Sequence, residues 1–314
     1  MIDIVGAGSM GLLYAAKLIA SGCPVRIWTR TEEQAQLLRD MGLELVLPNG
    51  HVQHLAQIYA YPLDEAVERL RQAGQQIDKL GLFVKQTHWT DHLLEHLREL
   101  HVSDALSVVC FQNGIGHMER LKKLWSRGVL LSAVTTEAAK RLTPNRVAHT
   151  GLGITYIGGD QKLSSNHKSA DEWYNLLNLA GIQTSVSNNI EGMIYQKLLI
   201  NAVINPLTAI LRVPNGELLN GSTRIQLMRS VFTEVQAIYA AVGIEIGEQD
   251  WEIIKQVCER TASNTSSMLA DVLQHRSTEI EAITGALLQL AEQHGVDAPV
   301  QRSLYLLVRA LDPN

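Results

Sequence analysis

Three glycines near the start of the chain separate a short apolar run from an apolar helical pattern. Gly6 permits a tight turn, Gly8 lets a ligand approach the backbone closely, and Gly11 lets a helix pack on the preceding strand. A helix start also offers free N–H groups and the positive end of its dipole to a phosphate. The pattern therefore predicts a dinucleotide, with a glycine turn in another kind of α/β protein as the alternative. The predicted pyrophosphate loop is Gly6, Ala7, Gly8, Ser9, Met10 and Gly11.

An arginine stands at the end of the second predicted strand. NAD-specific sites place an acidic residue here, roughly 20 residues past the glycines, to bind the ribose 2′-hydroxyl. This chain has Arg30 instead. A guanidinium pairs with a 2′-phosphate, whereas a carboxylate would repel it. Arg30 therefore predicts NADP(H), and an arginine that is merely solvated at a strand end is the alternative.

A polar stripe interrupts an otherwise apolar helical pattern in the second half of the chain. Lys197, Asn201 and Asn205 recur at four-residue spacing, which places them on one face of a helix. Polar side chains on an apolar helix are costly unless they face partners or a wet cleft. The stripe therefore indicates a candidate site, and a solvated lysine stripe is the alternative.

The first half of the chain alternates strand-like and helix-like patterns. Strands are predicted at residues 24–29, 80–84, 106–111 and 129–134, and residues 31–34 form a capping box before a second helix. This alternation is typical of a doubly wound, mostly parallel sheet. Residues 149–159 are expected to form a late strand pair that closes the domain, and residues 164–168 a surface loop.

The second half is expected to be entirely helical. The predicted helices cover residues 190–211, 222–241, 248–260, 279–294 and 300–311. An α/β half followed by a helical half indicates a dinucleotide-binding domain at residues 1–187 and a substrate domain at residues 188–314. Ligands commonly sit in the cleft between two such domains.

Composition favours a globular protein that acts on small molecules. The chain has 314 residues, 46% hydrophobic content and a net charge of −5, so neither a nucleic acid nor a membrane surface is an expected partner. The N-terminus enters a strand without a basic leader, which predicts a cytoplasmic location. Cys23, Cys110 and Cys258 form no C-x-x-C pair and are interpreted as core residues. Apolar helix faces are compatible with a homodimer as well as with a monomer core.

Three histidines offer a competing interpretation. His88, His92 and His96 follow a four-residue spacing that is compatible with a metal site on a helix. The neighbouring Thr90 and Arg98 suit a solvated helix face better. No metal is therefore expected.

The chain resembles the 2-dehydropantoate 2-reductase (ketopantoate reductase) family over nearly its whole length. The resemblance implies a Rossmann-type domain followed by a helical domain similar to that of 6-phosphogluconate dehydrogenase. The residues that carry it are the glycine loop, Arg30, Lys85, Gln112-Asn113-Gly114, Lys197 to Ala209, Pro214-Asn215-Gly216-Glu217-Leu218, Asn264 to Asp271 and Thr278-Glu279-Ile280.

The resemblance implies NADPH-dependent reduction of a 2-oxo acid, 2-dehydropantoate, to (R)-pantoate. Lys197 would be the general acid, and Glu279 would orient it while contacting substrate and cofactor. Without the resemblance, Glu279 would be interpreted as a solvated glutamate at a helix start. Lys85 and Asn113 match cofactor contacts at the carboxyl edge of the sheet, although each is also compatible with an ordinary loop. The implied substrate-binding residues are Asn113, Asn201, Asn205, Asn215, Asn264 and Ser267.

The chain departs from the family pattern at two places. His88 stands where the family has Gln, and residues 281–285 contain Thr284 where the family favours Asn. Because such changes can alter which 2-oxo acid binds, a reductase of another branched 2-oxo acid is the second hypothesis. A third is a regulator that senses NADP without turnover, against which the presence of both Lys197 and Glu279 argues.

Overall fold

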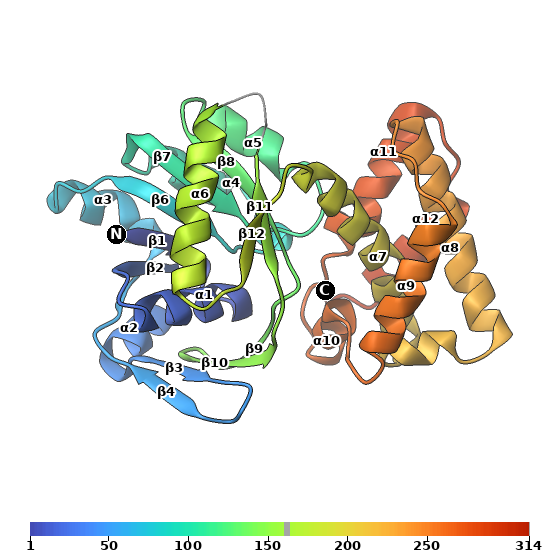
Figure 1. Ribbon diagram of the computed structural model, residues 1–314, viewed down its shortest axis with the longest axis horizontal. Helices are drawn as coiled ribbons and strands as arrows, with labels where there is room; N and C mark the ends of the chain where they lie inside the picture. Colours follow the sequence, from blue (N-terminus) through green and yellow to red (C-terminus); the bar gives the residue numbers. More distant parts are fainter. Residues whose placement is uncertain (160–163, 314) are drawn as a thin grey trace. The chain divides into compact units, whose positions relative to one another are not determined.

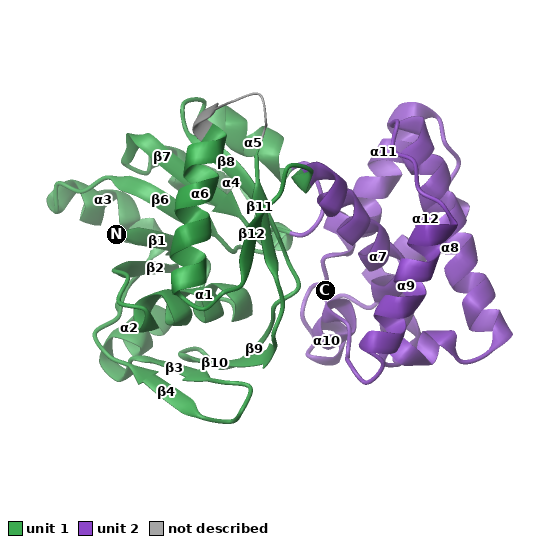
Figure 2. Cartoon of the chain, in the orientation of Figure 1, with its two compact units in different colours: residues 1–112, 117–190 green, residues 113–116, 191–314 purple. Residues whose placement is uncertain are grey.

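The computed structural model describes residues 1–159 and 164–313, which form two compact units (Figures 1 and 2). Unit 1 comprises residues 1–112 and 117–190, and unit 2 comprises residues 113–116 and 191–314. Residues 113–116 therefore belong to unit 2, although the segments on both sides of them belong to unit 1. After residue 190 the chain stays in unit 2. The fold class predicted from the sequence is confirmed: a mostly parallel sheet precedes a helical unit.

An eight-stranded sheet forms the frame of unit 1. Its strand order is β12-β11-β8-β7-β6-β1-β2-β5, and all neighbours are parallel except β11 with β8. Every residue of β1 and β2 is buried, as in strands covered on both faces. The strands are β1 (Ile2–Val5), β2 (Val25–Thr29), β5 (Tyr59–Pro62), β6 (Ile77–Leu82), β7 (Val102–Cys110), β8 (Val129–Thr135), β11 (Thr155–Gly158) and β12 (Thr184–Val186).

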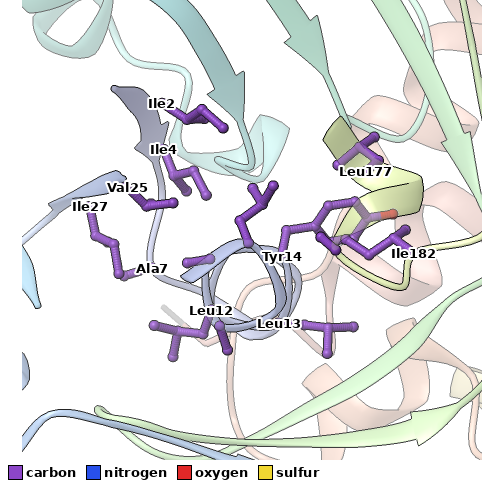
Figure 3. Packing of buried hydrophobic residues seen from close by; sticks show 14 of the residues in the cluster. Ile2, Ile4, Ala7, Leu12, Leu13, Tyr14, Val25, Ile27, Leu177 and Ile182 are labelled. Carbon is purple, nitrogen blue, oxygen red and sulfur yellow. The ribbon is translucent and has the colours of Figure 1, made fainter. Parts of the chain in front are cut away.

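Helices cover both faces of this sheet. Successive residues of β7 point to opposite faces: Val109 packs in the cluster that contains α1 and α6, and Val108 in the cluster that contains α3, α4 and α5. In Figure 3, Leu12 and Tyr14 of α1 lie among the buried side chains of the first cluster, the one that contains Val109. The helices are α1 (Ser9–Ala20), α2 (Glu32–Met41), α3 (Ala66–Gln72), α4 (Asp91–Glu99), α5 (His117–Leu124) and α6 (Ser164–Leu179).

A second sheet of four strands also packs against α1, and the sequence did not reveal it. Its order is β4-β3-β10-β9, with β3 and β10 parallel although about 100 residues separate them. The predicted strand pair at residues 149–159 was wrong, because β10 belongs to this second sheet whereas β11 pairs with β8 and β12 in the first. The strands are β3 (Leu43–Val46), β4 (Val52–Leu55), β9 (Ala138–Thr143) and β10 (Arg146–Gly151).

Two further local predictions need correction. Residues 164–168 were predicted to be a surface loop, but they form the first turn of α6. The expected capping box at residues 31–34 is only half present. Thr31 Oγ1 accepts a hydrogen bond from the backbone of Gln34, but the Gln34 side chain does not return to Thr31 and instead donates to Ala7 O at 3.0 Å.

Helices build unit 2, and no strand occurs in its described residues. The predictions for residues 190–211, 222–241 and 248–260 are confirmed to the residue. The segment 279–294 instead begins with a single π-helical stretch, Glu281–Gly285, and a short helix after residue 266 was missed. The helices are α7 (Ile190–Leu211), α8 (Ser222–Ala241), α9 (Glu248–Arg260), α10 (Ser267–Leu273), α11 (Ala286–His294) and α12 (Pro299–Arg309).

The central helix of unit 2 explains one sequence signal. By length and composition alone, α7 could cross a membrane, since its most apolar window has a mean hydropathy of 1.3. Leu198, Val203 and Leu207 of this helix are buried in the core with side chains from α8 and α9. The apolar composition of α7 is therefore what a core helix requires.

Candidate active site

The polar stripe of α7 lies at the edge of an apolar core. Asn205 is buried, and Lys197 and Asn201 are half-buried, while Leu198 and Leu199 beside them are fully buried. Helix α8 braces this part of α7, because the Tyr239 hydroxyl donates a 2.8 Å hydrogen bond to the carbonyl of Tyr195. The lysine is thus carried by a rigid element rather than by a loop.

Lys197 and Glu279 are coupled electrostatically. Burial lowers the pKa of Lys197 from its ordinary value to about 8, because a low-dielectric environment disfavours the ammonium form, and the negative charge of Glu279 acts in the opposite direction. An amine with this pKa is still mostly protonated at pH 7 and gives up its proton more readily than an ordinary lysine. Such a side chain is able to donate a proton near neutral pH.

Glu279 is held from a distant part of the sequence. Only 7% of Glu279 is exposed, and its Oε2 accepts a 3.1 Å hydrogen bond from the side-chain amide of Asn113. It directly precedes the helical segment that begins at Ile280, where unpaired N–H groups favour a negative charge. The structure thus brings Lys197, Glu279 and Asn113 into one unit, whereas the predicted boundary at residue 187 had placed Asn113 in the other domain.

A hydroxyl relay fixes the loop that leads into α10. Thr208 Oγ1 lies 2.9 Å from the carbonyl of Ile204 and 2.7 Å from Ser266 Oγ, which accepts from the backbone of Leu269 at 3.1 Å. One set of protons satisfies all three contacts: Ser266 donates to Thr208, and Thr208 donates to Ile204. Ser266, which the sequence did not single out, is therefore the buried anchor, and Ser267 next to it is exposed.

Asn264 and Asn215 lie on two segments that are joined to each other. The backbone N–H of Asn215 donates to Asn264 O at 3.0 Å, and the Asn215 side chain donates to Thr261 Oγ1 at 2.9 Å. Asn215 is buried, whereas Asn264 is exposed. The arrangement makes Asn215 a support for the segment that presents Asn264.

The glycine loop of unit 1 has the geometry of an anion site. Gly6 has φ +106°, and a Cβ there would lie 2.9 Å from the backbone of Phe83, while a Cβ on Gly11 would collide with the carbonyl of Gly6. At Gly8 the same position meets no protein atom within 4 Å. Gly8 caps α1 without a side-chain hydrogen bond, and the first turn holds no acidic residue. The loop is therefore open to a phosphate where the backbone must approach it.

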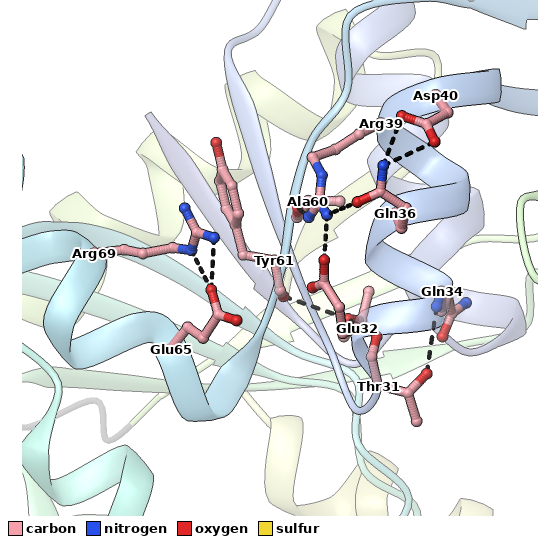
Figure 4. A network of polar contacts seen from close by, with 11 residues as sticks. Thr31, Glu32, Gln34, Gln36, Arg39, Asp40, Ala60, Tyr61, Glu65 and Arg69 are labelled. Carbon is pink, nitrogen blue, oxygen red and sulfur yellow. Dashed lines mark hydrogen bonds and ion pairs between the residues drawn. The ribbon is translucent and has the colours of Figure 1, made fainter.

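The acidic residue nearest to Arg30 in sequence already has an ion-pair partner. Arg30 is exposed directly after β2, and Glu32 follows at the start of α2. Figure 4 shows Glu32 paired with Arg39, which also donates to Ala60 O at 2.7 Å. Arg39 thus neutralises Glu32 and holds it against β5, whereas Glu33 is exposed in the same turn.

A buried glutamine shapes the strand exits of unit 1. Gln112 Nε2 donates 3.1 Å hydrogen bonds to the carbonyls of both Leu82 and Val84, which lead directly to Lys85. The signal in the sequence was the Gln-Asn-Gly turn after a buried strand. Gln112 therefore fixes the direction of the chain at Lys85, and Asn113 beside it is the first residue of unit 2.

The three histidines do not share one helix. His88 ends a 3-10 turn at residues 86–88, whereas α4 begins at Asp91 and carries His92 and His96 with their Nε2 atoms 3.2 Å apart. The predicted i, i+4, i+8 spacing was therefore wrong for His88, because the chain turns at Trp89. Within residues 1–159 and 164–313, no group of three or more His, Cys, Asp or Glu side chains is placed to hold a metal ion.

The fold and these features define a class of protein. A Rossmann-type unit with an uncapped glycine loop, followed by a helical unit with a half-buried lysine and a buried glutamate, is the architecture of a dinucleotide-dependent oxidoreductase. Comparison with known sequences gives the family. The family model described as "Ketopantoate reductase PanE/ApbA" matches residues 2–161, and its C-terminal counterpart matches residues 189–312.

Whole-length relatives agree with this family. A 2-dehydropantoate 2-reductase of Listeria innocua is 32% identical over 316 residues, covering 99% of this chain and 96% of the relative. A ketopantoate reductase structure from Ralstonia eutropha JMP134 has a TM-score of 0.86 at 25% identity and covers 99% of this chain and 98% of its own. A D-mandelate dehydrogenase solved with NADH and anilino(oxo)acetate has a TM-score of 0.85 at 26% identity, with the same coverage.

The chain belongs to the ketopantoate reductase family. It is accordingly an oxidoreductase that acts on a CH–OH group and binds a nicotinamide cofactor. The open position at Gly8 and the uncapped start of α1 are compatible with the pyrophosphate of that cofactor.

Proposed function

We propose that this chain reduces 2-dehydropantoate to (R)-pantoate with NADPH, a step of pantothenate and coenzyme A biosynthesis in the cytoplasm, with Lys197 as the general acid. The observation that carries the proposal is the position of Lys197 on one face of α7 with Asn201 and Asn205, under the charge of a Glu279 that Asn113 holds in place. The curated relative from Listeria innocua bears the name of this activity over the whole length of the chain.

The side chains of unit 2 supply the proton and stabilise the charge. When bound, the nicotinamide supplies a hydride to the ketone carbon of the substrate. Negative charge then develops on the ketone oxygen, where the Lys197 ammonium stabilises it and donates a proton, which gives the alcohol and a neutral amine. Glu279 keeps the lysine charged before this step and is itself held by Asn113.

Neutral side chains suit the rest of the substrate. Asn201, Asn205, Asn264 and Ser267 can hydrogen-bond the carboxylate and hydroxyl groups of a 2-oxo acid, and Asn215 positions Asn264 through the contacts described above. We assign substrate binding to residues 188–314 and cofactor binding to residues 1–187. Lys85, which follows β6, and Asn113 are assigned to the cofactor as well.

The phosphate preference rests on Arg30. Its guanidinium can pair with a 2′-phosphate, and Glu32, which would otherwise repel that phosphate, is neutralised by Arg39. The Michaelis constant for NADPH should therefore rise far more than that for NADH in Arg30→Ala. Equal effects on the two cofactors would remove Arg30 from this role.

A second substrate is favoured by two observations. The structural likeness to a D-mandelate dehydrogenase indicates that this fold accepts other 2-hydroxy acids. The two departures at residues 281–285 differ in burial: Thr284 is fully buried, whereas the exposed Glu281 accepts at Oε2 a 2.5 Å hydrogen bond from the Tyr305 hydroxyl. A reductase of another branched or aromatic 2-oxo acid is therefore the alternative.

The test is an NADPH-oxidation assay with a panel of substrates. Purified protein is given 2-dehydropantoate, 2-oxoisovalerate or benzoylformate, each with NADPH and with NADH. The highest kcat/KM for 2-dehydropantoate with NADPH supports the proposal, and a higher value for another acid supports the alternative. A lack of turnover with every acid would contradict both.

A further inference from the structure

Hydrogen bonds attach the second sheet of unit 1 to the glycine loop. The backbone N–H of Arg141, on β9, donates a 3.1 Å hydrogen bond to Ser9 Oγ, and its Nη1 lies 3.4 Å from the carbonyl of Ala7. Gln34 reinforces the attachment, because its Nε2 donates both to Ala7 O at 3.0 Å and to Pro144 O at 2.8 Å. The β9 strand therefore runs directly beside the predicted pyrophosphate loop.

The contact with Ser9 also orients a donor. A serine hydroxyl has one proton and two acceptor positions. Because the Arg141 N–H occupies an acceptor position of Ser9 Oγ, the hydroxyl proton is left to donate elsewhere. Ser9 is the first residue of α1, where the backbone N–H groups can also bind an anion.

The guanidinium of Arg141 contacts the glycine loop itself. Its contact is with Ala7, which stands between Gly6 and Gly8, and Gly8 is the position that has no protein atom within reach of a Cβ. Arg141 is exposed, and a guanidinium with five N–H donors can serve the loop carbonyl and a phosphate at once. The acidic residue closest to β9 in sequence, Glu137, is buried against His149 at 2.5 Å.

We propose that Arg141 is a second cationic residue of the cofactor site, which binds the pyrophosphate, while Arg30 binds the 2′-phosphate. The inference rests on the nicotinamide cofactor of the proposed function but not on the identity of the 2-oxo acid. The pyrophosphate is favoured because Arg141 contacts Ala7 and Ser9 of the glycine loop, whereas Arg30 stands at the end of β2. Arg141 thereby gives the second sheet a role in cofactor binding.

The roles proposed for Arg141 and Arg30 predict different changes in the Kd values of the two cofactors. NADPH and NADH share the pyrophosphate, and only NADPH carries the 2′-phosphate. Arg141→Ala should therefore raise the Kd of NADPH and of NADH by the same factor, about 10- to 100-fold, as expected for the loss of charge-assisted hydrogen bonds. Arg30→Ala should raise the Kd of NADPH alone.

The experiment is a fluorescence titration of both cofactors without substrate. The variants are Arg141→Ala, Arg141→Lys, Arg30→Ala and, as matched control, Lys140→Ala, whose side chain leaves the opposite face of β9. Arg141→Lys should recover part of the affinity because it keeps the charge, and the loss in Arg141→Ala should shrink at high salt. Lys140→Ala should bind both cofactors as the unchanged protein does.

Three results would overturn the proposal. Unchanged Kd values in Arg141→Ala would leave only a packing role for Arg141, and a loss confined to NADPH would assign it to the 2′-phosphate. In Arg141→Ala, a loss of cofactor affinity that is insensitive to salt, together with a lower melting temperature of the cofactor-free protein, would mean that the loop has merely deformed. If the unchanged protein bound neither cofactor, the cofactor assignment itself would fail, which is a different result from the other three.

Discussion

The side-chain amide of Asn113 donates a 3.1 Å hydrogen bond to Oε2 of Glu279, although 166 residues separate them in sequence. Asn113 leaves the first unit immediately after Gln112 and joins the second. Because the amide can only donate through its nitrogen, it selects one oxygen of the carboxylate and fixes the orientation of Glu279. The charge that acts on Lys197 is thereby held in place.

Removal of this hydrogen bond should weaken catalysis. In Asn113→Ala we expect kcat to fall on the order of 10-fold, since a mispositioned catalytic group is costly. Asn113→Asp should be worse, because a second carboxylate beside Glu279 disfavours its charged form. Steady-state kinetics of the two variants checks this, and an Asn113→Asp variant as active as the unchanged protein would refute the orientation argument.

The rate of ketone reduction should depend on the protonation of Lys197. The lysine acts as an acid only when protonated, so the rate should be full at low pH and should fall as the pH rises through about 8. Alcohol oxidation needs the neutral amine and should rise over the same range. In Glu279→Gln the loss of negative charge should move both midpoints to lower pH, and profiles that keep their midpoint in that variant would show that Glu279 does not act on the lysine.

Asp312 is predicted to act on Glu279 through the backbone. Its Oδ1 accepts a 2.9 Å hydrogen bond from the N–H of Thr278, the residue directly before Glu279. Asp312→Ala should lower kcat on the order of 10-fold and should shift the pH profile, because the carboxylate of Glu279 moves relative to Lys197.

Two variants control this prediction. Asp312→Asn keeps an acceptor oxygen and should retain most activity, and Arg309→Ala removes only the 3.8 Å ion pair with Asp312. A variant Asp312→Ala that is less stable but has an unaltered pH profile would show that Asp312 supports the fold and not Glu279.

The stability of unit 1 should depend on one buried ion pair. Asp3 accepts hydrogen bonds from Arg26 Nε and Trp28 Nε1, both at 2.7 Å, and the side chains of Asp3 and Arg26 are 1% and 8% exposed. Asp3→Ala leaves a buried guanidinium without its partner and should cost about 3–5 kcal/mol of unfolding free energy.

An exposed ion pair is the matched control for that measurement. Figure 4 shows the ion pair between Glu65, directly before α3, and Arg69 within it. Their side chains are 44% and 41% exposed, and Glu65→Ala should cost less than about 1 kcal/mol. Urea denaturation of both variants gives the comparison. Equal losses would contradict the view that burial decides the value of these pairs.

The elements predictable from sequence are those whose pattern is local. Helix α7 was predicted to the residue because its apolar spacing is helical throughout. The buried runs of β6 and β7 were found, but these strands begin three and four residues earlier than predicted. The second sheet was missed. Its strand β9 is almost wholly exposed and carries Lys140 and Arg141, and the pairing of β3 with β10 joins segments about 100 residues apart, which leaves no periodic trace.

The candidate site also contains residues that the sequence pattern reveals and residues that it does not. Lys197 could be found from its four-residue spacing with Asn201, because an apolar helix makes a polar residue conspicuous. The supports of the site could not: Gln112, Ser266 and Asp312 act through backbone groups, and any strand exit or helix start would accept such residues. Their roles appear only once the fold brings their partners together.

The most direct test of the account is the turnover of Lys197→Ala with 2-dehydropantoate and NADPH. We predict that kcat falls about 10²–10⁴-fold, as expected when a general acid is lost, while the Kd of NADPH stays within twofold or so. Lys255→Ala, which removes a surface lysine of the same unit paired with Glu252, should leave kcat unchanged. Near-normal turnover of Lys197→Ala would contradict the account, because the reaction would then not need Lys197 as its acid.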